Sequence, residues 1–79
     1  MFKNKCGERN NICGIKIREL RLNAKPKMSQ RALADKIQLH GIDIDKNAVQ
    51  RIESGERFVT DIELNAFAEI FSVSSADLI

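Results

Sequence analysis

The chain has 79 residues, enough for one small domain that can bury only about 60–65% of its unfolded surface. Its 43% hydrophobic content and single proline support a modest core built from several helices. No apolar run approaches the ~18 residues of a membrane span, and the N-terminus lacks a signal-peptide core, so we expect a soluble cytoplasmic protein without a membrane partner.

The net charge of +2 says little about partners, but its distribution along the chain is uneven. Residues 1–31 hold nine Lys or Arg against two Glu, a balance of +7, whereas residues 32–79 hold four against nine acids, a balance of −5. A positive end is what contact with DNA phosphates needs. The alternative is a solvated basic tail.

Residues able to support catalysis or to bind metal are scarce. Cys6 and Cys13 lie too far apart for a zinc pair, which indicates free thiols. His40 with Asp43 and Asp45 is weak evidence for a metal site, because Asp45 also fits a helix cap. With one His, no phosphate-cradling glycine loop and no paired carboxylates in a pocket-forming pattern, we expect no enzyme, no cofactor and no metal.

The first third of the chain predicts a loose arm and one helix. Residues 1–11 mix charge, Gly and Asn without helical periodicity, so we expect a flexible N-terminal arm before a domain over residues 12–79. Asn10 or Asn11 can cap the helix, and Pro26 ends it. The predicted buried stripe is Cys13, Ile17, Leu20 and Ala24. The predicted residues off this stripe are Lys16, Arg18, Arg21 and Lys25.

A second helix is predicted to begin after Ser29, which fits an N-cap, and to run to Leu39 or His40, with Gly41 closing it. Met28 and Leu33 fit a hydrophobic staple across its start. Leu33, Ala34 and Ile37 are predicted to face inward. After it, Ile42 and Ile44 alternate with acids, which predicts an extended segment folded over the core.

A third, short helix lies between Asp45, a predicted N-cap, and Gly55, a predicted left-handed stop. Its apolar positions, Val49 and Ile52 with Ala48 beside them, share one face. The other face carries the donors that read base edges: Lys46, Asn47, Gln50 and Arg51.

The last third predicts a fourth helix and the start of a fifth. Thr60 and Glu63 form a capping box, and Ser74 fits the cap of the next helix. The fourth helix has an apolar stripe at helical spacing, composed of Leu64, Phe67, Ala68 and Phe71. We expect the largest core side chains to be Phe58, Phe67 and Phe71.

The segments M-S-Q-R-A-L-A-D-K-I and V-Q-R-I-E-S-G-E-R together resemble the helix-turn-helix of the phage repressor and Cro family, the XRE-type regulators, over residues 12–79. The resemblance implies an all-α, compact five-helix domain like that of lambda repressor, with the predicted second and third helices forming the motif. The connection between those two helices is about five residues longer than the family's usual turn.

The resemblance also implies a function. Residues 46–53 would enter the major groove of double-stranded DNA, reading bases with Lys46, Asn47, Gln50 and Arg51, as a bacterial or phage transcriptional regulator, a repressor rather than an activator. The residues expected to hold phosphates are Gln30, Arg31, Ser54, Arg57, Lys25 and Lys27. A homodimer on a palindromic operator is expected, with Val73, Leu78 and Ile79 as seeds of its interface. The sequence does not indicate whether a small-molecule effector exists.

Three alternatives stay open. Arg51 could pair with Glu53 or Asp35 instead of a base, and Gln30 could be an ordinary polar residue at the start of a helix. We expect Glu53 to have a structural role, for example as a partner of Arg57. The same helical core could also serve as a protein-interaction module or antitoxin-type component, with the acidic C-terminal half as its binding surface.

Overall fold

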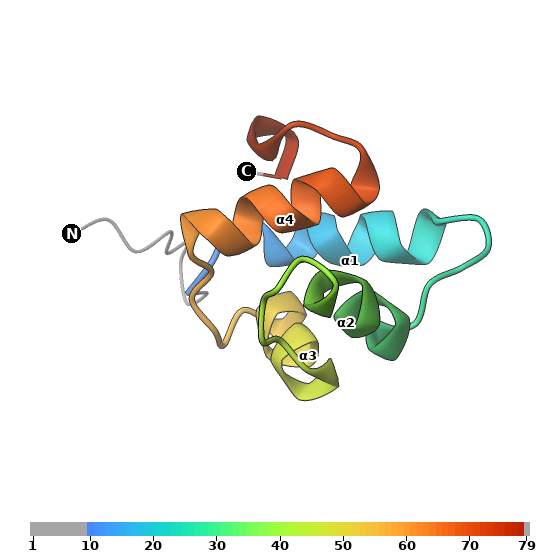
Figure 1. The fold of residues 1–79 in the computed structure, drawn as a ribbon. Helices are drawn as coiled ribbons and strands as arrows, with labels where there is room; N and C mark the ends of the chain where they lie inside the picture. The colour runs from blue at the N-terminus through green and yellow to red at the C-terminus, as the bar shows by residue number, and fades with distance from the viewer. Residues whose placement is uncertain (1–9, 79) are drawn as a thin grey trace.

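A computed structural model of the chain describes residues 10–78, and over this range four α-helices and one 3-10 turn make up the regular structure. Helix α1 spans Gly14–Asn23, α2 spans Gln30–Gln38, α3 spans Lys46–Ser54 and α4 spans Asp61–Phe71. The turn η1 spans Ser75–Leu78. In Figure 1, α4 crosses in front of α1, while α2 and α3 lie together below them. The predicted all-α domain is therefore confirmed.

The start of α1 is joined to the end of α3. Asn11 is fully buried, and its Oδ1 accepts a hydrogen bond from the Gly14 backbone N–H at 2.8 Å. Its Nδ2 donates to the carbonyl oxygens of Ile52 at 2.9 Å and Arg57 at 2.7 Å. The N-cap of α1 is Cys13, two residues after the predicted Asn11, but the Asn11 side chain still accepts from the first N–H of α1 and also satisfies carbonyl groups at and just beyond the end of α3. The rest of the predicted arm, residues 1–9, lies outside the described residues.

The predicted starts of α2 and α3 are confirmed because their N-caps form, whereas α2 ends at Gln38, just before the predicted Leu39 or His40. Ser29 Oγ accepts from the Ala32 N–H at 3.0 Å, and Asp45 Oδ1 accepts from the Ala48 N–H at 2.8 Å. Gly55 ends α3 with φ 88°, a left-handed conformation that glycine adopts without the clash of a Cβ. The short helix α3 thus has both ends defined by side-chain or backbone chemistry.

Residues 39–45 join α2 to α3, which makes the connection longer than the three or four residues of a common helix-turn-helix turn. Gly41, at φ 78°, lets the chain turn after α2. Ile44 is fully buried, and its carbonyl oxygen accepts from Gln38 Nε2 at 3.1 Å. His40 Nδ1 lies 3.3 Å from Glu69 Oε2 on α4. The connection is therefore part of the folded body, as the alternation of Ile42 and Ile44 predicted.

Helix α4 has the predicted capping box: Thr60 Oγ1 accepts from the Glu63 N–H at 3.2 Å, and Glu63 Oε1 accepts from the Thr60 N–H at 3.0 Å. The predicted fifth α-helix is wrong, because the chain after α4 forms only the four-residue 3-10 turn η1. Ser72 ends α4 in a left-handed conformation, φ 56°, and residues 75–78 then turn back against α1 and α4.

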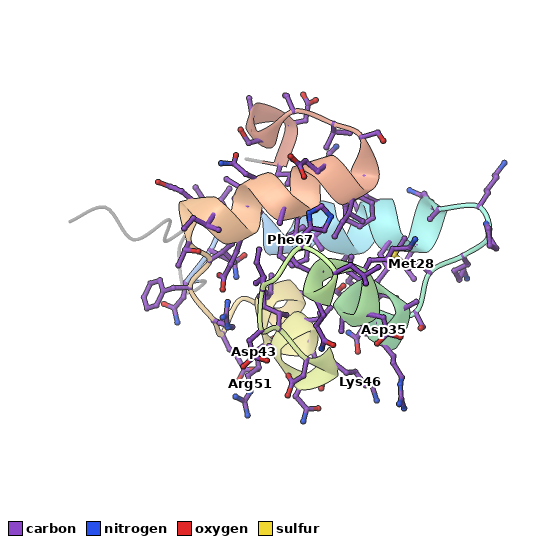
Figure 2. All side chains as sticks on the ribbon, viewed as in Figure 1. Met28, Asp35, Asp43, Lys46, Arg51 and Phe67 are labelled. Atoms are coloured by element: carbon purple, nitrogen blue, oxygen red, sulfur yellow. The ribbon has the colours of Figure 1, made fainter. Side chains whose placement is uncertain are left out.

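The core lies where all the helices meet, with Phe67 at its centre (Figure 2). Its fully buried side chains include Ile17, Leu33, Ile37, Ile44, Val49 and Ile52. Phe58 is 46% exposed, so its predicted place in the core is wrong. Leu78 is fully buried within the chain and is therefore not available as a seed of a dimer interface. No helix of residues 10–78 is long and apolar enough to cross a membrane.

Candidate nucleic-acid interface

Helix α3 presents two chemically different faces. Val49, Ile52 and Glu53 are buried against the body of the protein. The opposite side carries five exposed polar side chains, Lys46, Asn47, Gln50, Arg51 and Ser54. At about 100° per residue these five lie within an arc of roughly 140°. In Figure 2, Lys46 and Arg51 lie on α3 at the edge of the molecule, away from Phe67. The predicted base-reading residues therefore share one solvent-facing surface.

The other face of α3 is held by a buried ion pair. Arg21 on α1 donates from Nε to Glu53 Oε2 at 2.7 Å and from Nη2 to Glu53 Oε1 at 2.9 Å. The side chains are only 10% and 3% exposed. Arg21 Nη1 also donates to the Met28 carbonyl at 3.0 Å, and Gln30 Nε2 donates to Glu53 Oε1 at 3.1 Å. One carboxylate on α3 thus binds α1 and the start of α2 together.

This network decides two of the open alternatives. Gln30 is more than a polar surface residue, because it buttresses α3 through Glu53. Glu53 has the predicted structural role, but its expected partner was wrong: it pairs with Arg21 and not with Arg57. Arg51 pairs with neither Glu53 nor Asp35 and stays exposed. Its guanidinium is consequently free of a salt bridge within the described part of the chain.

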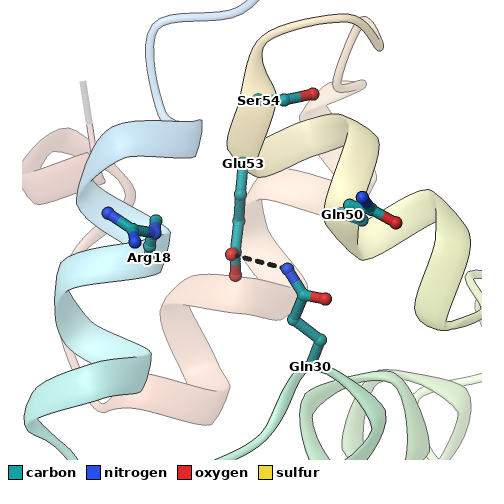
Figure 3. Close-up of a pocket in the computed structure, with 5 residues that line it drawn as sticks. All are labelled: Arg18, Gln30, Gln50, Glu53 and Ser54. Atoms are coloured by element: carbon teal, nitrogen blue, oxygen red, sulfur yellow. Dashed lines mark hydrogen bonds between the residues drawn. The ribbon is translucent and has the colours of Figure 1, made fainter.

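Two shallow pockets flank the exposed face of α3. One of about 310 Å³ is lined by Arg18, Gln30, Gln50, Glu53 and Ser54 (Figure 3). The other, of about 320 Å³, lies between α2 and the start of α3 and includes Arg31, Asp35 and Lys46. The structure therefore brings three predicted phosphate ligands, Gln30, Ser54 and Arg31, next to the predicted base readers. Ser54 Oγ itself lies 3.1 Å from the Arg51 carbonyl and 2.9 Å from Glu56 Oε2.

Lys25 and Lys27 lie elsewhere, around a third hollow between the α1–α2 connection and α2. On α2 this hollow uses Ala32 and Lys36, whereas the pocket next to α3 uses Arg31 and Asp35. Residues 31 and 32 are about 100° apart around a helix. The two lysines thus flank the predicted interface and are not part of the surface formed with α3, so their phosphate contacts remain predictions.

Arg57 is held by α4. Its Nη1 and Nη2 donate to Glu63 Oε1 and Oε2, each at 2.9 Å, and Nη1 also donates to the Phe58 carbonyl at 3.1 Å. The hydrogen bonds to Glu63 raise the pKa of Arg57 despite its partial burial. Burial by itself would raise the pKa of Glu63, but the hydrogen bonds from Arg57 and Thr60 outweigh it and lower that pKa. A phosphate contact by Arg57 would therefore compete with an existing bidentate pair.

Sequence reasoning missed Arg21 and Arg18. Arg21 was expected off the buried stripe, and this was wrong, because it is only 8% exposed. Residues 13, 17 and 21 follow one helical row, so the signal was a charge at the third position of a buried row, which requires an opposite charge nearby. Arg18 lines the pocket in Figure 3 from α1, a placement that no local spacing indicates. Within residues 10–78, no group of three or more His, Cys, Asp or Glu residues is placed to hold a metal ion.

A protein-family model described as helix-turn-helix matches residues 17–78. The match covers most of the chain, and the chain belongs to this family, the XRE-type or Cro/C1-like helix-turn-helix domains. Members bind double-stranded DNA and typically regulate transcription, and the family is not one of enzymes. No curated protein and no solved structure matches the chain in the two other comparisons.

The buried ion pair gives a stability prediction. Arg21→Met leaves the Glu53 carboxylate buried without its cation, so the free energy of unfolding should fall by about 3–5 kcal/mol. The double variant Arg21→Met/Glu53→Met replaces both charges with apolar groups and should lose less than the single variant. Urea denaturation of the two single variants and the double variant measures the coupling. Strictly additive losses would show that the pair contributes no coupling energy.

The Arg57–Glu63 pair gives a pH prediction. Because folding lowers the pKa of Glu63, its stabilisation is complete above the ordinary value of about 4.5 and is lost as the pH falls through the lower pKa of the folded state. The parent protein should therefore exceed Glu63→Gln in stability near neutral pH, and the difference should shrink in acid. Asp61→Asn, in the same turn of α4, is the control. A difference that does not change with pH would refute the assignment.

Proposed function

We propose that this protein is a sequence-specific transcriptional regulator that inserts α3 into the major groove of an operator. The observation that supports it most is the exposed face of α3. Lys46 and Arg51 there can donate to guanine, and Asn47 and Gln50 can form paired hydrogen bonds with adenine. Four adjacent side chains of base-reading type, on a short helix rigidly held from behind, suit direct readout of sequence.

The positions of the proposed phosphate ligands support the same docking. Gln30 lies at the start of α2, where backbone N–H groups and the helix dipole favour an anion. One N–H of its amide is used by Glu53, and the second N–H is available for a phosphate oxygen. Arg31, beside Lys46, would add a further contact on the other flank of α3. Such contacts would fix the orientation of α3 without reading sequence.

We further propose that the regulator binds as a homodimer and acts as a repressor. One α3 reads only a half-site, and two copies related by a two-fold axis would place their reading helices about 34 Å apart on a palindrome. Of the residues first considered for the interface, Val73 is partly exposed and remains a candidate, while Leu78 is excluded by its burial. Repression requires only occupancy of the operator, whereas activation requires an additional surface for the transcription machinery.

Selection from a randomised duplex library tests this function directly. The purified protein should retain a palindrome with half-sites about ten base pairs apart, and its affinity should fall steeply with salt because phosphate contacts release counterions. Retention without enrichment would mean that the protein binds phosphates alone and would refute sequence-specific reading. No retention at low salt would refute DNA binding and favour the alternative of a protein-interaction module or antitoxin-type component.

Arg51 is the sharpest single test of base reading. Arg51→Ala should weaken binding to the selected operator by about 1–3 kcal/mol and relax the preference at one base pair in each half-site. The fold should be unaffected, because the guanidinium is exposed and has no salt bridge. The control is Lys36→Ala, which removes an exposed positive charge from α2 outside the proposed interface. Equal effects of the two variants on every base position would contradict base reading by Arg51.

A further inference from the structure

The pocket in Figure 3 contains a cation that neither the fold nor the proposed base reading uses. Arg18 approaches it from α1, Gln50 and Ser54 lie on the side of α3, and Gln30 and Glu53 lie between them. The Arg18 side chain is exposed and forms no hydrogen bond or ion pair with another described residue. Every residue that lines the pocket is polar or charged.

The charges around this pocket favour an anion. Its only acid, Glu53, is 6% exposed, and both of its oxygens accept hydrogen bonds from Arg21. That buried pairing offsets the negative charge of the pocket floor, and Arg18 is then left as an uncompensated positive charge at the surface. Without Arg21, the pocket would set one carboxylate against one guanidinium and would have no preference for an anion.

The two edges of the pocket differ in how well they suit an anion. At one edge the Ser54 hydroxyl contacts Glu56, an exposed acid that would repel a negative ligand. At the other edge Gln30 has one amide N–H beyond the bond to Glu53, and Arg18 lines the same pocket from α1. The favourable position therefore lies between Arg18 and Gln30, where a guanidinium can bind phosphate oxygens in its planar fork geometry.

We propose that Arg18 binds a backbone phosphate of the operator, together with Gln30, and thereby fixes how deeply α3 enters the groove. The inference rests on the proposed function, because it takes the anion to be a DNA phosphodiester. Gln50 links the two sites: it lines the pocket and belongs to the exposed face of α3, so an anion there borders the groove that α3 reads. Arg18 is thus a positioning residue that adds affinity for any sequence.

The test compares Arg18→Gln with Lys16→Gln on the operator recovered by selection and on an unrelated duplex. Both variants lose one positive charge from α1, but residues 16 and 18 point about 200° apart. Lys16 is exposed and lies 4.0 Å from Glu19, outside the pocket. Arg18→Gln should bind both duplexes about tenfold more weakly. Its plot of log affinity against log salt should be less steep by about 0.9, the value for one lost phosphate contact. Lys16→Gln should keep the parent slope.

Two further measurements make the outcome decisive. Arg18→Lys, which keeps the charge, should recover the salt slope but not all of the affinity, because ammonium lacks the bidentate geometry. A neutral methylphosphonate at the contacted position should weaken the parent protein more than it weakens Arg18→Gln, in which only Gln30 still contacts that phosphate. The Arg18 assignment is overturned, and the regulator function stands, if the parent binds its operator and Arg18→Gln keeps the parent salt slope. An equal loss of affinity and slope in Lys16→Gln would overturn the assignment in the same way. If the parent binds no DNA, both fail.

Discussion

The carboxylate of Glu53 and the guanidinium of Arg21 meet inside the protein, away from water, and their pairing joins α1 to α3. Removing two charges from water costs several kcal/mol per ion, a cost offset only when the geometry is good and the remaining donors and acceptors are satisfied. Here the contacts are bidentate, and Met28 and Gln30 complete the network from the α1–α2 connection and α2. Such a network contributes orientation more than net stability, since an apolar pair could fill the same volume but would not define one angle between the helices.

That orientation is supported from two other directions. Asn11 connects the start of α1 to carbonyl groups at the end of α3. Ile44, in the connection that precedes α3, is fully buried. Helix α3 is nine residues long, too short to be stable alone in water. It is held by its caps, by Val49 and Ile52 in the core, and by the Glu53 network. All of these contacts lie at its ends or on one face, which leaves the opposite face entirely to polar side chains.

The sequence predicted the features that depend on local chemistry and periodicity. The caps at Ser29, Asp45 and Thr60, the turns at Gly41 and Gly55, and the inward faces of α2, α3 and α4 are all as expected. The failures concern contacts between residues that do not belong to the same helix. Glu53 pairs across 32 positions with Arg21, and Arg57 pairs with Glu63 because the chain reverses between α3 and α4. Which acid meets which base depends on tertiary packing, and so does the exposure of Phe58 and the burial of Leu78. The base contacts remain predictions, although the exposed face of α3 agrees with them.

In α3, the residues that end the helix and attach it to the core are different from the residues that face the solvent. Asp45 and Gly55 terminate the helix, and Val49, Ile52 and Glu53 supply its attachment to the rest of the protein. The solvent-facing positions 46, 47, 50 and 51 contribute to neither task, so their identity is nearly independent of stability. Evolution or a designer can therefore vary these four positions as a library on a constant scaffold, and a new binding preference need not be accompanied by a compensating mutation in the core.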